Sequence, residues 1–266
     1  WEPPLHPILS GGHVASWEMF PSLPSGLIFS SNPSNNFEKP LSTGPDRTLS
    51  ITESGKVLFS DNYGMSYLSL PSTVSVHPIA IETSSSRGFS AFSTYAIRFD
   101  DGSVWWNNTF LQVYQNEYVI DVALAERHWC YLLDSGIVRC WGHNLHGGFG
   151  DGTPASDIWR NQTNTSNVTL PAGRFAIEIS SGGGYTCAIL DNMELFCWGM
   201  VPSIPSLISA NNITQLDTDY SYDYGICALL DIGAISCSSG NYYPPTGRTF
   251  KQLGGGKILC ALLDNN

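Results

Sequence analysis

Six of the seven cysteines in this 266-residue chain fall into three pairs, and their shared spacing favours oxidation to disulfides. Nine residues separate the members of each pair, which are Cys130 and Cys140, Cys187 and Cys197, and Cys227 and Cys237. The enclosed sequences are near-repeats: YLLDSGIVR, AILDNMELF and ALLDIGAIS. A fourth copy begins at Cys260 with the sequence ALLDNN.

Each enclosed sequence is predicted to be a β-hairpin. In the first copy, Leu132-Leu133 precedes the turn Asp134-Ser135-Gly136, and Ile137-Val138 resumes a strand. A three-residue loop ending in glycine matches a common hairpin class. The paired cysteines, equidistant from Ser135, then face each other with Cα atoms about 4.5 Å apart, within disulfide range. The alternative is free cysteines packed as small hydrophobes; zinc is disfavoured because no site has a second close pair of Cys or His.

The hairpin turns recur along the whole chain and predict an all-β propeller. Seven turns are found, with a mean spacing of about 40 residues. They lie at 24–26, 53–55, 100–102, 134–136, 191–193, 231–233 and 264–266. Strands at such a period are typical of propeller blades. We therefore expect residues 1–266 to form a single seven-bladed β-propeller domain with hairpin disulfides, closed without open sheet edges.

Residues 128–153, HWCYLLDSGIVRCWGHNLHGGFGDGT, resemble one blade of the regulator of chromosome condensation repeat. That family has a similar H-x-x-A-L-x-x-D-G-x-V-x-x-W-G-x-N-x-x-G-Q-L-G pattern and folds as a seven-bladed propeller. Gly148-Phe149-Gly150 stands here where the family has Gln-Leu-Gly. The resemblance is good over 182–199, 225–238 and 254–264 and weak before residue 125.

The cysteine-bearing repeats are more similar to the secreted branch of that family. This branch includes the crinkly-type plant receptor kinase ectodomains, which carry seven cysteine-paired repeats. It also includes β-lactamase inhibitor protein II, a secreted bacterial relative that uses the same ring to bind protein. This chain differs from both, because its first three repeats lack cysteines and it has no kinase or membrane segment. The resemblance implies a propeller used for binding.

Paired cysteines, sequons and charge together favour an extracellular glycoprotein. Disulfides persist in oxidising compartments. Five Asn-x-Ser/Thr sequons are predicted N-glycosylation sites, namely Asn107, Asn161, Asn164, Asn167 and Asn212. The formal net charge is −11, and the lack of a basic stripe disfavours nucleic acid as a partner. We expect a secreted or cell-surface location with N-linked glycans.

The two ends of the sequence leave several possibilities open. No apolar run reaches about 18 residues, so no membrane span is predicted. No signal peptide is seen, and Trp1 is expected to be a mature or excised start. Cys260 would pair with a residue beyond Asn266. Either the chain is one module of a longer extracellular protein, or residues 1–8 close the ring in the last blade, or Cys260 is free.

No group of residues predicts catalysis, a metal site or a cofactor. The segment 217–223 has alternating carboxylates but lacks the glycine and final acidic residue of a calcium loop. His143 and His146 are expected in a structural turn. Asp100-Asp101 is expected to form a hairpin turn rather than a glycosidase pair. No Ser-His-Asp or Cys-His arrangement is marked by local sequence.

Aromatic residues in loops are the better candidates for function. Trp159, Tyr242 and Tyr243 are predicted to contact a ligand or partner, whereas Trp141 and Trp198 are expected to pack between blades. The leading prediction is a non-catalytic binding or assembly module that presents rim loops to a protein partner or neighbouring subunit. The alternatives are a carbohydrate-binding or carbohydrate-active propeller, such as a lectin or glycoside hydrolase, and a guanine-nucleotide exchange factor if the chain is cytosolic.

Overall fold

Strands dominate the part of the chain that the computed structural model describes. The described residues are 7–10, 13–17, 41–43, 47–52, 54–61, 64–70, 77–84, 94–107, 109–111, 117–202, 204–210, 212–218, 225–254 and 260–264. Helix α1 (Ser206–Ala210) has five residues. Within these ranges, no helix has the length and apolar character needed to cross a membrane.

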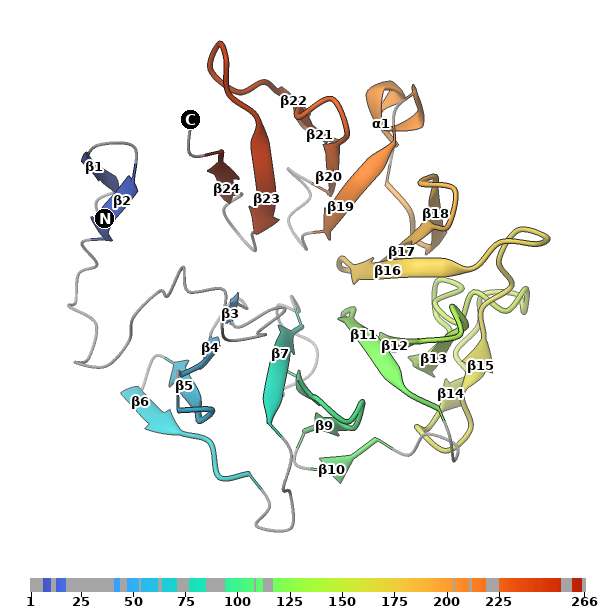
Figure 1. Ribbon diagram of the computed structural model, residues 1–266. Helices are drawn as coiled ribbons and strands as arrows, with labels where there is room; N and C mark the ends of the chain where they lie inside the picture. Colours follow the sequence, from blue (N-terminus) through green and yellow to red (C-terminus); the bar gives the residue numbers. More distant parts are fainter. Residues whose placement is uncertain are drawn as a thin grey trace.

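The strands form five antiparallel blades arranged around a common centre (Figure 1). Blade I consists of β3 (Leu41–Thr43), β4 (Arg47–Ile51), β5 (Val57–Asp61) and β6 (Gly64–Tyr67). Blade II consists of β7 (Pro78–Thr83), β8 (Tyr95–Phe99), β9 (Val104–Trp106) and β10 (Thr109–Phe110). Blade III is β11 (Val119–Leu124), β12 (His128–Leu133), β13 (Val138–His143), β14 (Trp159–Arg160) and β15 (Ser166–Asn167). Blade IV consists of β16 (Ala176–Ser181), β17 (Tyr185–Leu190) and β18 (Leu195–Gly199). Blade V consists of β19 (Ile213–Thr218), β20 (Ile226–Leu230), β21 (Ile235–Cys237) and β22 (Gly240–Tyr242). In blades II–V the first strand lies nearest the centre and is called the inner strand (Figure 1).

The all-β propeller is confirmed, but the prediction of seven blades is wrong for the described residues, which form five. A blade needs a turn that brings a third strand back against the second. The turns predicted at 24–26 and 264–266 lie outside the described residues, apart from Asp264. Within the described residues, the two end sheets have two strands each: β1 (Pro7–Ser10) with β2 (His13–Trp17), and β23 (Phe250–Gly254) with β24 (Cys260–Leu263).

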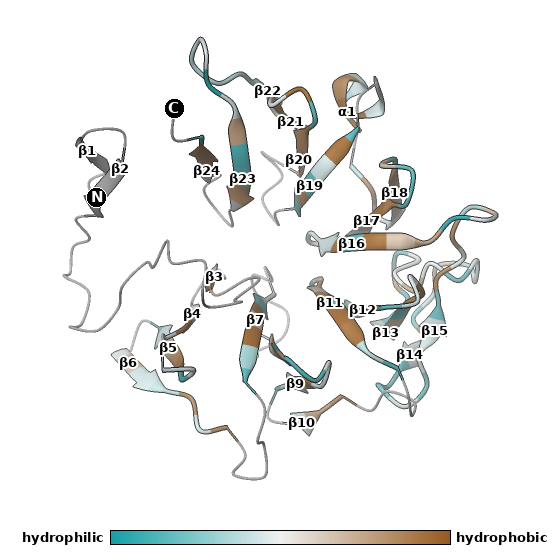
Figure 2. Cartoon of the chain, in the orientation of Figure 1, coloured by the Kyte–Doolittle hydropathy of each residue, from teal (hydrophilic) through white to brown (hydrophobic). Residues whose placement is uncertain are grey.

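The three predicted disulfides are present, and each joins the second and third strands of one blade. The bonded pairs are Cys130–Cys140, Cys187–Cys197 and Cys227–Cys237, with Cα–Cα distances of 4.1, 4.0 and 4.0 Å. The cysteines of each pair lie directly opposite one another in the strand register. Figure 2 shows hydrophobic residues along the inner strands β11 and β16. Each bridge fastens a single hairpin, so other interactions must hold the blades to one another.

Each hairpin turn joins its blade to the next one. In blade IV the Asp191 N–H donates to the Phe175 carbonyl (2.9 Å), which lies just before the inner strand of the same blade. The Met193 carbonyl then accepts the N–H of Ile213, the first residue of the next inner strand (3.2 Å). Bonds of the first kind, within one blade, also join the N–H of Asp100 to His77, Asp134 to Tyr118, Asp231 to Asn212 and Asp264 to Thr249. Bonds of the second kind, from the next inner strand to the turn, join the N–H of Val119 to Gly102, Ala176 to Gly136 and Phe250 to Gly233. The Asp side chain adds a second bond, since the Asp191 carboxylate accepts the Phe175 N–H (3.2 Å) and the Asp264 carboxylate accepts the Thr249 N–H (3.0 Å).

A second series of hydrogen bonds, here called the bulge links, runs from one inner strand to the next. Every inner strand of blades II–V, and β23, has a bulge near its start. The inner strand is the edge of its sheet, so beyond the bulge every second backbone N–H faces the free edge without a sheet partner, and a buried N–H must find another acceptor. The acceptor is a side chain of the preceding inner strand. The bulge links join Ile179 N–H to Asp121 (3.0 Å), Leu216 N–H to Glu178 (2.9 Å) and Leu253 N–H to Gln215 (2.7 Å).

Replacing Gln215 with leucine is expected to loosen the β23–β24 hairpin. Gln215 accepts the Leu253 N–H and donates its Nε2 to the Leu253 carbonyl (2.8 Å), so both backbone groups would lose their partner. The expected loss is about 1–3 kcal/mol, with faster amide exchange at Leu253. The matched control is Gln252→Leu, at the equivalent exposed position of β23. Equal effects of the two substitutions on stability and exchange would contradict the bulge link.

A buried polar network joins blades III and IV. His128 is 2% exposed, and its Nε2 lies 2.8 Å from Thr186 Oγ1. Thr186 Oγ1 is also 2.7 Å from Ser181 Oγ. Burial, with a smaller contribution from the charge of His146, lowers the pKa of His128 from 6.5 to about 4. The folded protein therefore favours the neutral imidazole.

We expect acid to destabilise the protein through His128. Between pH 6.5 and about 4 the unfolded chain binds a proton that the folded chain does not, so stability falls as the pH is lowered through this window. The full loss is about 3 kcal/mol. Urea unfolding at pH 7, 5.5 and 4.5 should show a smaller pH dependence in His128→Gln than in the wild type. His77→Gln, which replaces an exposed histidine, is the control. Parallel pH curves for wild type and His128→Gln would refute the assignment.

Candidate protein-binding surface

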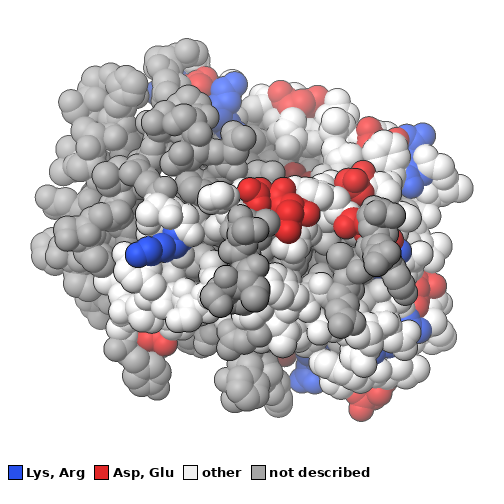
Figure 3. Space-filling model, turned by 60° about the horizontal axis from the view of Figure 1, so that its bottom comes forward, with Lys and Arg blue, Asp and Glu red and all other residues white. Residues whose placement is uncertain are grey.

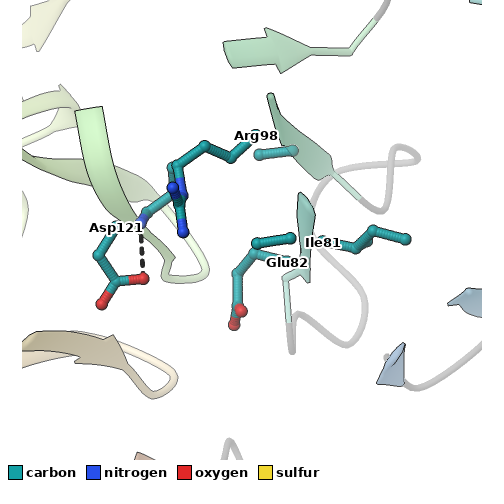
Figure 4. A pocket seen from close by; sticks show the side chains of 7 residues that line it. Ile81, Glu82, Arg98 and Asp121 are labelled. Carbon is teal, nitrogen blue, oxygen red and sulfur yellow. Dashed lines mark hydrogen bonds between the residues drawn. The ribbon is translucent and has the colours of Figure 1, made fainter. Parts of the chain in front are cut away.

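A small hollow lies between blades II and III, where the bulge link is missing (Figure 4). Ala80 stands at the position that Asp121 occupies in blade III and has no acceptor to offer. The Val122 N–H instead bonds to the adjacent Asp121 carboxylate (2.9 Å). Arg98 replaces the Leu or Ile found opposite this position in the other blades and points into the hollow, which Glu82 and Asp121 also line. The hollow is thus a local variation of the repeat.

Five exposed apolar side chains lie at or beside the hairpin turns of blades III–V. They are Ile137 (40% exposed), Phe175 (49%), Ile177 (40%), Met193 (40%) and Ile232 (54%). We call this set the turn-face surface. A large exposed apolar patch on a soluble domain often marks an interaction site.

Contacts between neighbouring blades make the turn-face surface continuous. A Cβ atom on Gly136, in the blade III turn, would lie 2.5 Å from the Cβ of Phe175. The Phe175 N–H donates to the Asp191 carboxylate of the blade IV turn (3.2 Å). The Asn212 amide, at the start of blade V, donates to Asp231 of the blade V turn (2.9 Å). Three successive turns are therefore held side by side.

Met193 carries a conformational cost at this surface. Its φ is +64°, in the left-handed region that favours glycine. The equivalent positions of the other four turns are Gly55, Gly102, Gly136 and Gly233, all with positive φ. The chain thus has an exposed methionine where its own repeat has glycine. Residues in such strained conformations cluster at functional sites.

Acidic groups border the turn-face surface. Asp134, Glu194 and Asp231 are exposed beside the turns. The Arg174 guanidinium is paired with Asp191 (2.9 Å), which offsets its charge. On the face drawn in Figure 3, acidic side chains also form groups, whereas Lys and Arg stand apart. With a net charge of −11, this pattern favours a partner with basic residues around an apolar contact.

The three predicted binding residues are not brought together. Trp159 pairs with His143 at the end of β13, whereas Tyr242 pairs with Ile235 at the start of β21. Because β13 and β21 are equivalent strands of their blades, these ends lie on opposite faces of the propeller. Tyr242 and Tyr243 are exposed at the outer edge of blade V, on the same face as its turn. They extend the margin of the turn-face surface, and Trp159 does not.

Trp159 belongs to an aromatic cluster on the other face. Its ring lies edge-on to Trp129 (centroids 5.7 Å apart) and to His143 (4.7 Å). Trp129 in turn contacts Trp106 of blade II (5.0 Å) and Trp141 (5.9 Å). Trp141 is buried between blades, as is Trp198 in blade IV, in agreement with the sequence prediction.

The remaining predicted residues have structural surroundings. Asp100 accepts the His77 N–H (3.1 Å) and Asp101 accepts the Ser103 N–H (2.8 Å), as expected of turn residues. His143 Nδ1 lies 3.1 Å from Asp157. Within the described ranges, no group of three or more His, Cys, Asp or Glu is arranged to hold a metal. Most of the segment 217–223 lies outside those ranges.

The sequons lie at the surface. Asn161, Asn164, Asn167 and Asn212 are exposed, and Asn107 is partly buried in the turn after β9. Asn161 and Asn164 lie between β14 and β15, and Asn167 lies in β15, all on the long connection of blade III. Asn212 precedes β19 beside the turn-face surface.

Comparison with known proteins supports the family resemblance. No family model matches the chain. The Arabidopsis thaliana protein "RCC1 domain-containing protein RUG3, mitochondrial" is 26% identical over 175 residues, which cover 56% of this chain and 38% of that protein. Human WBSCR16 superposes with a TM-score of 0.64 at 11% identity, covering 84% of this chain and 71% of that one. The fold is an RCC1-like β-propeller.

A third comparison finds a similar fold in a receptor ectodomain. The CRINKLY WD40 ectodomain of the Arabidopsis thaliana receptor kinase ACR4 superposes with a TM-score of 0.54 at 15% identity, covering 85% of this chain and 77% of that one. At this identity the likeness is one of fold alone. The matched region spans well under half of the curated RUG3 protein, so the activity of that whole protein does not transfer to this chain.

Sequence reasoning missed the turn-face surface, although a signal was present. Met193 and Ile232 occupy turn positions where Ser, Asn, Asp or Gly is expected. An apolar side chain at such a position remains in contact with solvent and gains no stability from burial. Stability alone therefore does not explain why it is there. Their assembly into one surface depends on the contacts between blades.

Met193→Gly is expected to stabilise the protein. Glycine adopts the observed φ of +64° without the Cβ penalty, which is about 1–2 kcal/mol for other residues. Part of this gain is offset by the greater entropy of glycine in the unfolded chain, so we expect a rise in unfolding free energy of about 1 kcal/mol. The control is Met200→Gly, which removes an exposed methionine that has no positive φ. A decrease in stability with Met193→Gly would contradict the strain argument.

Proposed function

We propose that this RCC1-like propeller is an extracellular, non-catalytic binding module whose turn-face surface holds a protein partner or a neighbouring subunit. The single observation that carries the proposal is Met193. It is exposed, apolar and strained at a position where the other described turns have glycine. Strain that brings no packing benefit is best explained by a contact made outside the chain.

Charge and rigidity support the same surface. Exposed carboxylates surround the apolar residues, so the partner is expected to present an apolar anchor with Lys or Arg at its margin. The turns of blades III–V are fixed by hydrogen bonds to the adjacent inner strands and by a disulfide in each hairpin. A preorganised surface loses little conformational freedom on binding.

The compartment part of the proposal rests on the cysteines and sequons. Three disulfides in one domain favour an oxidising environment. Four of the five sequon asparagines are exposed. The relative RUG3 is described as mitochondrial and the crinkly structure is described as an ectodomain, and we propose the second location for this chain. We further propose that residues 1–266 are one module of a longer extracellular protein.

The binding proposal is tested with variants on the two faces of blades IV and V. Tagged, disulfide-bonded protein is incubated with the extracellular fraction of its source, and the retained partner is identified and quantified by mass spectrometry. Ile232→Ser is expected to lower retention about tenfold, since a central apolar contact contributes more than 1 kcal/mol. Met193→Gly is expected to lower retention while raising stability.

Met200→Ser is the matched control, because Met200 is exposed in blade IV near the end of β18 that lies away from the turns. It should retain the same partner at wild-type yield. Retention should also weaken as the salt concentration rises, because the acidic border contributes to the contact. Equal loss in Met200→Ser and Ile232→Ser, or no loss in any turn-face variant, would refute the assignment of this surface.

A further inference from the structure

The five sequons differ in how far their side-chain amides are already engaged. The Asn212 Nδ2, where a glycan would be attached, donates to the Asp231 carboxylate (2.9 Å). Asn107 is partly buried with a φ of +42°. Asn167 accepts a hydrogen bond from Arg139 Nε (2.9 Å), and Arg139 is itself held by a bidentate ion pair. Of these three, Asn212 is bonded through the nitrogen itself, whereas Asn107 and Asn167 are bonded through their amide oxygens to the more distant residues Tyr95 and Arg139.

Asn161 has a different arrangement. Its Oδ1 accepts hydrogen bonds from both the N–H (3.2 Å) and the hydroxyl (2.8 Å) of Thr163, the third residue of the same sequon. The side chain is exposed, and no described residue accepts a hydrogen bond from its Nδ2. The nitrogen to be modified is therefore accessible while the rest of the sequon is ordered.

Trp159 and Asn161 point to the same side of the chain. Between them, Arg160 points inward, where its Nη1 contacts Asp151 (2.7 Å) and its guanidinium lies 4.5 Å from the centre of the Phe149 ring. Side chains alternate along an extended segment, so the two neighbours of Arg160 point outward. Their Cα atoms are separated by about 6.6 Å of extended chain.

The Trp159 ring is both fixed and half exposed. Edge contacts with Trp129 and His143 hold it, while 51% of the residue remains accessible. Such a ring offers a rigid apolar surface with little entropy to lose on contact. The C–H groups on one face of a pyranose ring form the complementary surface, and an N-linked sugar at Asn161 would begin within reach.

We propose that Asn161 carries an N-linked glycan whose first N-acetylhexosamine packs on Trp159, and that the Asn212 amide stays unmodified so that the turn-face surface is accessible. This inference rests on the extracellular location proposed above. In the attachment step Asn161 Nδ2 bonds to the anomeric carbon of a lipid-linked oligosaccharide diphosphate. The bond from that carbon to the diphosphate breaks, Nδ2 loses one proton, and the lipid diphosphate leaves. Trp159 is then a contact for the chain's own glycan.

The first measurement is glycopeptide and non-reducing disulfide mapping of the full chain secreted from eukaryotic cells. Asn161 should be largely occupied and Asn212 bare, with the three disulfides intact. This inference would be overturned if the disulfides had formed and other sequons carried glycans while Asn161 was bare. It would also be overturned if the disulfides had formed and Asn212 carried a glycan. Either result would leave the extracellular proposal standing. Free thiols with every sequon bare would overturn the extracellular proposal, and this inference with it.

The packing on Trp159 is tested by a double-mutant cycle in thermal unfolding. Thr163→Val removes the sequon but keeps Asn161, and should lower the unfolding temperature of the secreted protein by about 2 °C or more. In the Trp159→Ala background the same substitution should have a smaller effect. The cycle repeated on protein from the bacterial periplasm, which lacks the glycan, controls for the lost Thr163 hydrogen bond and should show no coupling. Additive effects in the glycosylated protein would overturn the packing.

Discussion

The backbone N–H groups that face the free edge of each inner strand are a constraint on which the arrangement of the blades depends. An edge strand has no sheet partner on that side, and near the centre of the propeller a buried N–H needs another acceptor. Asp121, Glu178 and Gln215 supply it, each to the next blade. The disulfides act within hairpins, so the bulge links and the turn bonds position one blade against another together with the apolar clusters packed between blades.

The blade II–III boundary shows what happens when a bulge link is lost. Ala80 cannot reach the Val122 N–H, which bonds instead within its own strand to Asp121. The vacated space is lined by Arg98, Glu82 and Asp121, and Arg98 takes a position that is aliphatic in the other blades. In this blade the missing acceptor at Ala80 is thus accompanied by a change at the residue directly opposite it, Arg98.

The same constraint gives the two faces of the propeller different characters. On one face, the turns of blades III–V are held in contact, so isolated apolar residues such as Phe175, Met193 and Ile232 become one surface bordered by carboxylates. On the other face, the long connection of blade III carries Trp159. The proposed binding surface and the proposed glycan contact on Trp159 therefore lie on different faces of one rigid scaffold.

Local features of the sequence determined the hairpins, the three disulfides and the propeller class. Cys130 and Cys140 are equidistant from Ser135, so a local turn fixes their register, and the Asp-x-Gly turns recur along the chain. Tertiary structure decided what depends on residues far apart in the sequence: the acceptors of the inner-strand N–H groups, the placement of Trp159 and Tyr242 on opposite faces, and the joining of Met193 with Ile232. Contacts between distant segments leave no period in the sequence, because each is set by how neighbouring blades pack.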